Sequence, residues 1–580
     1  MIDTILRFPL TIVLLVAASI MNVISTSNVN YVTVGSTQNE LFSKLFVAFL
    51  LGALVSVVGQ MTFERFFKEQ AIRYVYMGSG VLSSLVYYIA IKKANLVDVE
   101  LGIRTIVIFF ILIILFIWIP VINNRYHFNQ SFMAVFKAFF TSIFFTGVLY
   151  LGIAMLLGAI NLLITKLNGQ IYLHSATIIF VILAPIYLLS LIPNYYKEDE
   201  DSEHINRLLS PSKFLEALIS YIIIPITIAF TAILLIYIVM NITGEFWTDN
   251  LMEPLLVAYS LTVIVVYLLT CCLQSAIAKY FRLIFPKILI PVVLFQTVAS
   301  VLKINEVGVT YGRYYVILFG VFAIIVGVLF SILPLRKNGI IAPILIALSL
   351  VAIIPPVDAF TVSTSIQVSR LKEALQRNDI LKDDKIIGNK NVALKDQNII
   401  SSSITYLDQM NDTKRIKWLT AYTNSNNFKE TFGFDQYGGN SNNNYKYINV
   451  SRDENTPISV DGYDYLVRKN LNSKDENVIV SNFKQDGKEY SIKVTGEQNN
   501  RQIVLEQNGQ IVVSFELNQI IAKFKDSSEK SPVSSEEVTF TSENNAAVLT
   551  LIANNININE YENEDNKELF VDLYILLDIK

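Results

Sequence analysis

The hydrophobic residues of this chain are concentrated in its first part. Up to about Pro356 the sequence is a succession of long apolar runs, whereas from about Ser369 to Lys580 no such run recurs and Asn, Lys, Asp and Glu become frequent. A run of about 20 apolar residues can cross the hydrocarbon core of a bilayer as a helix. The pattern therefore predicts a polytopic α-helical membrane bundle followed by a large soluble domain.

Eleven apolar runs are candidate membrane spans. One of them, 133–165, is longer than a span requires, and tilt or a half-turn at the interface would absorb its excess. The first run follows Arg7, as in a signal peptide, but it lacks a small-residue cleavage site and is interpreted as a retained helix. The expected spans are 8–26, 41–60, 74–91, 101–122, 133–165, 171–193, 213–242, 254–278, 284–302, 314–333 and 339–356.

The Lys and Arg residues near the spans predict the orientation of the bundle, because cytoplasmic loops are enriched in both. With a cytoplasmic N-terminus, the inner loops carry more than twice as many of these residues as the outer loops. An odd number of spans then places the C-terminal part outside the plasma membrane, although one span more or fewer would reverse this. The outer loops hold Lys92, Lys93, Arg104, Lys166, Lys303 and Arg313. The first three are close together on the outer side, which this orientation does not predict.

The polar part of the chain changes its periodicity at about residue 445. Residues 369–423 have apolar side chains at helical spacing, for example Leu371 and Leu375. After Tyr445, apolar and polar residues alternate as they do in half-buried strands. Asn508-Gly509, between two alternating segments, is typical of a two-residue hairpin turn.

We therefore expect a soluble α+β part that is mostly antiparallel β and sandwich-like, with a short helix at 518–525. At about 210 residues this part is long enough to fold by packing alone. Three domains are expected: a transmembrane helical domain at 1–356, a juxtamembrane connector and helical subdomain at 357–444, and an extracytoplasmic β-rich domain at 445–580.

Composition and charge exclude several classes of protein. Hydrophobic residues make up 53% of the chain, and the net charge of −3 gives no reason to expect a nucleic-acid partner. Cys271 and Cys272 are adjacent, so their side chains point in different directions on a helix and form a poor metal or disulfide pair. The histidines, His127, His174 and His204, lie in separate segments. We expect no cofactor and no metal.

Several short motifs together resemble an uncharacterised bacterial membrane family, the domain of unknown function 4153. The motifs are, in order, Phe8-Pro9, the run around Pro225, FPKILIPVV, the pattern G-V-T-x-x-R-Y from Gly308 to Tyr314, SIQVSRLKEALQRNDIL after the last span, and VDGYDYL at 460–466. Each motif is weak alone, and their shared order carries the resemblance. It implies a membrane architecture and supplies no reaction.

The segment that contains Thr310, Arg313 and Tyr314 offers the best candidate ligand contacts. In the predicted topology it lies at the outer membrane edge, where Arg313 can bind an anionic head group or a carboxylate. Lys303 and Glu253, from nearby outer segments, complete the candidate clamp. The alternative is that these residues only anchor a helix end and pair loops structurally. No catalytic residue can be assigned.

Three functions remain open. The first is an envelope-associated binding, sensing or scaffolding protein whose outer domain contacts cell-wall polymer, a lipid head group or another envelope protein. The second is a membrane enzyme acting on lipid or lipid-linked glycan, which the short first outer loop with only Glu40 does not favour. The third is a transporter or permease component, although no Asp, Glu, Lys or Arg lies in the middle of a predicted span.

Overall fold

The computed structural model forms two compact units, Met1–Gln436 and Tyr437–Lys580, which are described separately. The residues that it describes are 2–27, 37–92, 94, 98–196, 202–241, 252–419, 421–422, 427–436, 445–453, 455–472, 478–496, 501–524, 532–561 and 567–580.

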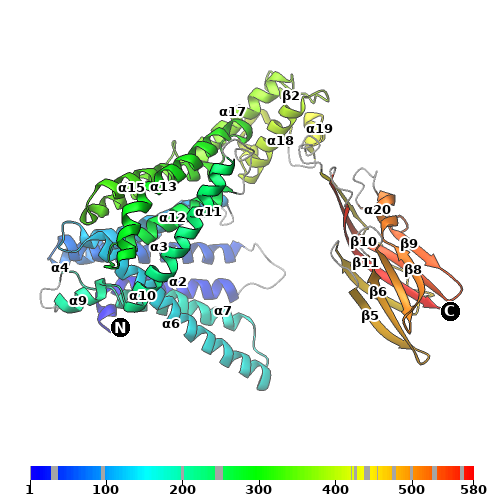
Figure 1. Ribbon diagram of the computed structural model, residues 1–580, viewed down its shortest axis with the longest axis horizontal. Coiled ribbons are helices and arrows are strands. Elements are labelled where there is room, and N and C mark those ends of the chain that lie inside the picture. Colours follow the sequence, from blue (N-terminus) through cyan, green and yellow to red (C-terminus); the bar gives the residue numbers. More distant parts are fainter. Residues whose placement is uncertain are drawn as a thin grey trace. The chain divides into compact units, whose positions relative to one another are not determined.

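The first unit begins with a membrane bundle (Figure 1), and 10 of its helices within the described residues are long and apolar enough to cross a membrane. The α-helices are α1 (Ile2–Arg7), α2 (Pro9–Ser27), α3 (Thr37–Phe66), α4 (Gln70–Ile91), α5 (Val99–Trp118), α6 (Phe128–Leu163), α7 (Gln170–Thr177), α8 (Ala184–Ser190), α9 (Ser202–Leu209), α10 (Lys213–Leu218), α11 (Ile224–Asn241), α12 (Met252–Thr270), α13 (Ala276–Leu302), α14 (Ile304–Val307), α15 (Tyr311–Ile332) and α16 (Ile341–Ile353).

The prediction of a polytopic helical bundle is confirmed, and the number of spans is close to the expected eleven. The difference lies at the expected span 254–278, where the apolar helix Pro254–Thr270 is shorter than the others. The chain turns after Thr270, and the Ser275 side chain accepts a hydrogen bond from Ala278 N at the start of α13. This N-cap explains why α13 begins before the expected position 284.

Two prolines inside the bundle follow wider helical turns. A π-helical segment, η2 (Ile178–Leu183), joins α7 to α8 just before Pro185, and η3 (Ile219–Ile223) joins α10 to α11 just before Pro225. Proline lacks an N–H and crowds the preceding turn, so a locally widened helix accommodates it without ending the span.

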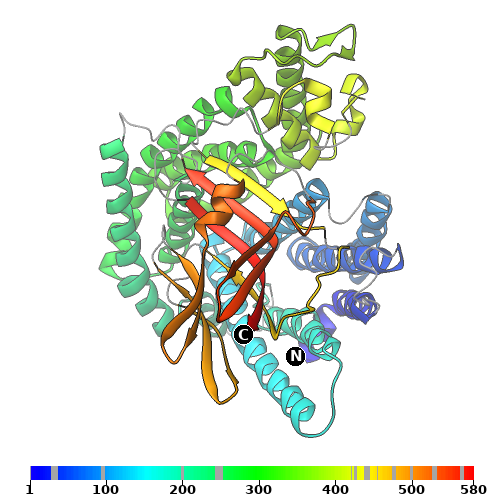
Figure 2. The ribbon, with the colours of Figure 1, turned by 90° about the vertical axis from the view of Figure 1, so that its right-hand side faces the viewer.

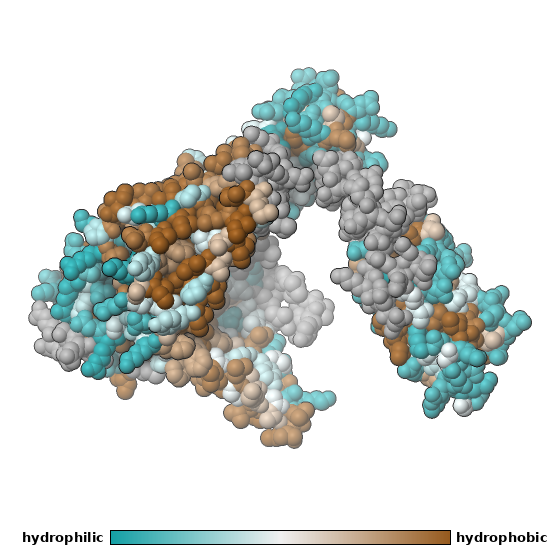
Figure 3. All heavy atoms as spheres, viewed as in Figure 1, coloured by the Kyte–Doolittle hydropathy of each residue, from teal (hydrophilic) through white to brown (hydrophobic). Residues whose placement is uncertain are grey.

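Glycines allow close helix packing in the bundle. A Cβ on Gly320 of α15 would lie 2.2 Å from Oγ1 of Thr297 on α13, and one on Gly327 would lie 2.8 Å from Cγ1 of Ile290. The contacting residue number on α13 falls as that on α15 rises, so these two helices are antiparallel. On the face shown in Figure 3, hydrophobic residues predominate over much of the bundle, as expected for a surface that faces lipid.

Helix α6 is the longest in the bundle within the described residues, with 36 residues. Its last part lies beside α7 (Figure 1), and the side chains of Leu162 and Leu163 are 83% and 78% exposed. The long run expected at 133–165 is therefore one continuous helix with an apolar end.

A helical subdomain continues the first unit beyond the bundle. Its elements are α17 (Ala359–Arg377), β1 (Leu381–Lys382), β2 (Lys385–Ile386), α18 (Leu394–Gln409), two 3₁₀ turns (Thr413–Arg415 and Lys417–Leu419) and α19 (Phe428–Phe432). Helix starts at Ala359, ten residues before the expected 369, and a two-strand hairpin interrupts the expected helical segment. The hydrophobic core of this subdomain also takes in Tyr311, Tyr314 and Tyr315 of α15.

The second unit is a β-sandwich, as predicted (Figure 2). One sheet has the order β3-β10-β11-β4, with β9 paired to β10, and the other has the order β5-β6-β7-β8. Both sheets contribute to one hydrophobic core. The elements are β3 (Tyr445–Ser451), β4 (Tyr465–Leu471), β5 (Val478–Gln485), β6 (Lys488–Thr495), β7 (Gln502–Gln507), β8 (Gln510–Glu516), α20 (Asn518–Phe524), β9 (Thr539–Glu543), β10 (Ala547–Tyr561) and β11 (Lys567–Ile579).

The predicted hairpin turn and the short helix are both present. Asn508 and Gly509 join β7 to β8, and both have positive φ, 51° and 84°. A turn with positive φ at both central residues matches the right-handed twist of the two strands, which explains the Asn-Gly pair.

Candidate functional site

The site lies in the loop between α14 and α15, at the point where the helical subdomain meets the bundle. Gly308 in this loop has φ +76° and ψ −178°, a backbone region that essentially only glycine adopts. A Cβ at Gly308 would lie 2.7 Å from Nε2 of Gln367 and 2.8 Å from an Nη atom of Arg370. The backbone conformation therefore requires glycine here, and a Cβ would also push aside the ends of the Gln367 and Arg370 side chains.

Three consecutive carbonyls of this loop accept hydrogen bonds from side chains. Gln367 of α17 donates through Nε2 to the carbonyls of Val307 and Val309, at 3.2 and 3.0 Å. Arg313 donates to the carbonyl between them, that of Gly308, at 3.2 Å. Because a buried carbonyl without a partner is costly, these bonds fix the loop against α17.

A second bond extends this junction to α18. The hydroxyl of Ser403 donates to Oε1 of Gln367 at 3.0 Å, and both side chains are buried. The amide of Gln367 thus uses its donor and its acceptor at once, and it ties together the loop, α17 and α18.

Two of the predicted contact residues, Thr310 and Tyr314, make structural hydrogen bonds. Thr310 is the N-cap of α15, and its side chain accepts a hydrogen bond from the backbone N–H of Arg313 at 3.3 Å. The hydroxyl of Tyr314 donates to the carbonyl of Val357 at 2.6 Å. Both residues hold the start of α15 in place.

Arg313 differs from these two because part of its hydrogen-bonding capacity is unused. Its side chain is 9% exposed, and its Nε is buried with no acceptor among the described residues. No acidic side chain within the described ranges forms an ion pair with it. A buried guanidinium with a free N–H favours an anion as an additional partner.

The remaining predicted residues, Lys303 and Glu253, come from other helices. Lys303 ends α13 and is 6% exposed. Because α13 and α15 are antiparallel, Lys303 lies at the same end of this helix pair as Arg313. Glu253 is at the start of α12, and its side chain lies outside the described residues.

An ion pair that the sequence analysis missed secures the start of α17. Asp358 is fully buried and accepts hydrogen bonds from the backbone N–H groups of Phe360 and Thr361, at 3.1 and 3.2 Å. Arg104 of α5 donates to the same carboxylate at 2.9 Å. Burial alone would raise the pKa of Asp358, but the hydrogen bonds from Thr361 and Phe360 and the charge of Arg104 outweigh it and lower this pKa.

The side chains around Gly308 can fix this loop against α17 and α18, and Arg313 can bind an anion. Gln367, Arg370 and Ser403 belong to the site although sequence reasoning did not single them out, because no local pattern reveals contacts between segments about sixty residues apart. Asp358 did carry a signal, since an Asp before a polar helix is a typical N-cap.

Comparison with known protein families identifies a match. The family model described as Domain of unknown function (DUF4153) matches residues 10–386, which include the bundle, the Gly308 loop and α17. The β-sandwich lies outside the matched residues. No curated protein and no solved structure matches the chain.

Proposed function

The chain belongs to this family, whose description states no activity, and we propose from the geometry that it is an envelope-associated binding protein. In this proposal the integral membrane bundle and the helical subdomain form a fixed base. The β-sandwich is the module that meets the ligand on the outer side of the membrane.

The observation that carries this proposal is the junction at Gly308. Gln367 joins the loop before α15 to α17 and α18, and Arg104 holds the cap of α17 from α5. A base fixed by buried hydrogen bonds suits a protein that presents a domain at a defined membrane surface, since each such bond resists local opening.

The side of the membrane can be tested with single cysteines. We expect Lys488→Cys, at an exposed position in the β-sandwich, to react with an impermeant maleimide on intact cells. The matched control, Lys337→Cys in the turn between α15 and α16, should react only after permeabilisation. The opposite result would refute the outer position, and the unsubstituted chain measures the background from Cys271 and Cys272.

The binding role requires a second measurement. The full chain in nanodiscs should sediment with insoluble envelope polymer from its source organism, whereas a chain lacking 437–580 should not. A folded truncated chain that sediments equally well would contradict the assignment of binding to the β-sandwich.

A second candidate function, the binding of an anionic lipid head group at Arg313, is favoured by the buried Nε of that side chain. Arg313→Ala should reduce the retention of phosphatidylglycerol, measured by native mass spectrometry, and leave phosphatidylcholine unchanged. Arg65→Ala is the control, because Arg65 also holds a loop, by donating to the carbonyls of Ile122 and Asn123. Equal retention in the two folded variants would exclude the head-group site.

A further inference from the structure

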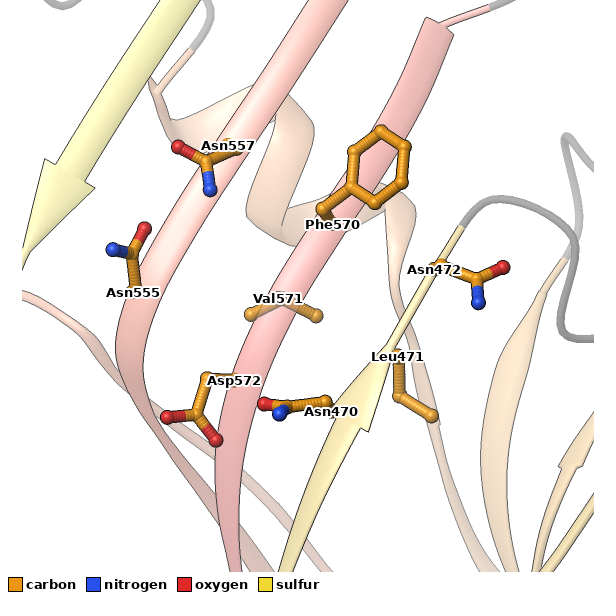
Figure 4. Close-up of a pocket in the computed structure, with 8 residues that line it drawn as sticks. All are labelled: Asn470, Leu471, Asn472, Asn555, Asn557, Phe570, Val571 and Asp572. Carbon is orange, nitrogen blue, oxygen red and sulfur yellow. The ribbon is translucent and has the colours of Figure 1, made fainter. Parts of the chain in front are cut away.

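A groove lies on one face of the five-stranded sheet in the β-sandwich (Figure 4). Its cavity measures about 220 Å³, and its accessible surface is largely apolar. Half of its lining residues are asparagines, and the others include one aromatic ring and one carboxylate. Phe570 of β11 is 37% exposed, and Asn470 on β4 and Asn472 just after β4 are also exposed. The groove is lined by Asn470, Leu471, Asn472, Asn555, Asn557, Phe570, Val571 and Asp572.

The strand register explains why the polar groups gather there. Asn555 of β10 pairs with Asp572 of β11, and Asp572 pairs with Asn470 of β4. In the next row outward, Asn557 pairs with Phe570. Directly opposed residues have side chains on the same face, so two adjacent rows place amides on both sides of the aromatic ring.

A β-bulge concentrates amides at the centre of the groove. The register of β10 against β11 shifts between Ala553 and Asn555. Beside this shift, Asn554 donates to the carboxylate of Asp572 at 3.3 Å. The Oδ1 of Asn555 is buried and accepts no hydrogen bond from the described residues. Bulges often re-aim side chains next to binding sites, and this one places the amides of Asn554 and Asn555 beside the carboxylate of Asp572.

The carboxylate in the groove is neutralised by a neighbour. Arg468 of β4 donates through two nitrogens to Asp572, at 3.1 and 2.6 Å. The hydrogen bond from Arg468 lowers the pKa of Asp572, which therefore stays ionised and paired. The groove thus has little net charge and combines a largely apolar surface with amide groups, so it suits a neutral ligand that has both apolar faces and hydroxyls.

We propose that this groove binds a neutral carbohydrate chain, with one sugar ring on Phe570 and a hydroxyl hydrogen-bonded to the exposed amide of Asn470. Amides both donate and accept, as neighbouring sugar hydroxyls do. The apolar C–H face of a sugar ring can pack on an exposed aromatic ring. This proposal rests on the proposed binding role of the β-sandwich and names the ligand class for it.

A peptide fits the groove less well. A peptide strand would bind by adding to a free sheet edge, here that of β4, whereas most lining residues lie on the face of β10 and β11, which are paired on both sides. Hydrolysis of the glycan is also not implied, because glycosidases use two carboxylates and the groove has one, held by Arg468.

The test uses the full chain in nanodiscs and neutral tetrasaccharides of glucose and of N-acetylglucosamine, with binding measured by saturation-transfer NMR and isothermal titration. We expect one of the two probes to bind. We expect Phe570→Ala to weaken it about tenfold, the loss that corresponds to about 1.4 kcal/mol. Asn470→Ala should weaken it in the same direction. The matched control is Ile511→Ala, which removes a side chain that is 60% exposed on the other sheet.

Three outcomes would overturn the proposal. The first is that neither tetrasaccharide binds the folded chain at millimolar concentration. The second is that the folded Phe570→Ala and Asn470→Ala chains bind like the unsubstituted chain, and the third is that an unstructured peptide competes for the groove. Far-UV circular dichroism and the thermal midpoint establish folding of each variant. The Phe570→Ala chain can also be tested for sedimentation with envelope polymer. If it still sediments, and this sedimentation is lost when residues 437–580 are removed, the groove assignment fails while the binding role of the β-sandwich stands.

Discussion

Replacing Gly308 by alanine should open the junction between the bundle and the helical subdomain. The backbone conformation of Gly308 costs a residue with a Cβ about 1–3 kcal/mol. The new Cβ would also displace Gln367, whose two hydrogen bonds to the loop contribute about 1 kcal/mol each. The sum is about 3–5 kcal/mol of local stability.

Hydrogen exchange measures this change directly, because protected amides exchange through local opening. A loss of about 3–5 kcal/mol should accelerate exchange at least about a hundredfold in α15 near Tyr311 and in α17 near Gln367. Exchange in the β-sandwich should not change.

Gly312 provides a matched control one turn away. A Cβ there would meet nothing within 4 Å, and the residue lies inside α15. Gly312→Ala should therefore be neutral or stabilise α15 by up to about 1 kcal/mol. Native-like exchange in the folded Gly308→Ala chain would refute the argument that this glycine holds the junction.

Two further predictions concern a charge and a turn. Asp358→Asn keeps an N-cap side chain but removes the charge that pairs with Arg104, so the thermal midpoint should fall at neutral pH. Because folding lowers the pKa of Asp358, its contribution is present above the unfolded value of about 3.9 and is lost as the pH falls further, so the two midpoints should converge below about pH 4. If the gap stays constant with pH, the charge is not its source. Gly509→Ala should destabilise the β-sandwich by about 1–2 kcal/mol in a denaturant titration through backbone strain alone, since a Cβ there meets no atom within 4 Å. An unchanged midpoint would contradict this.

The features that the sequence predicts well depend on local patterns. Apolar runs indicated the spans, and Asn508-Gly509 indicated the turn between β7 and β8, because both turn positions have positive φ. The missed hairpin at 381–386 has a similar two-residue turn, in which Asp383 and Asp384 have φ of 49° and 57°. The hairpin lies within a segment whose apolar residues have helical spacing, so the sequence predicted helix there instead of two short strands.

The candidate site could be predicted only in part, because its contacts join distant segments. The G-V-T-x-x-R-Y pattern directed attention to Thr310 and Arg313, and both do lie in the Gly308 loop region. Gln367, which donates to the carbonyls of Val307 and Val309, follows almost sixty residues later, and the early start of α17 depends on Asp358 meeting Arg104 from α5. Such pairings arise from tertiary packing and leave no periodic trace in the sequence.

The length of α6 has a consequence for the lipid around the protein. At about 1.5 Å per residue, its 36 residues extend about 54 Å, well beyond a hydrocarbon core of about 30 Å even at a steep tilt. The exposed leucines at its end, Leu162 and Leu163, resist contact with water. Tilt of this helix, or stretching of the neighbouring acyl chains, would keep this end out of water. The elastic cost of that stretching is smallest in a thick bilayer, so hydrophobic mismatch would sort this protein towards the thicker regions of its membrane.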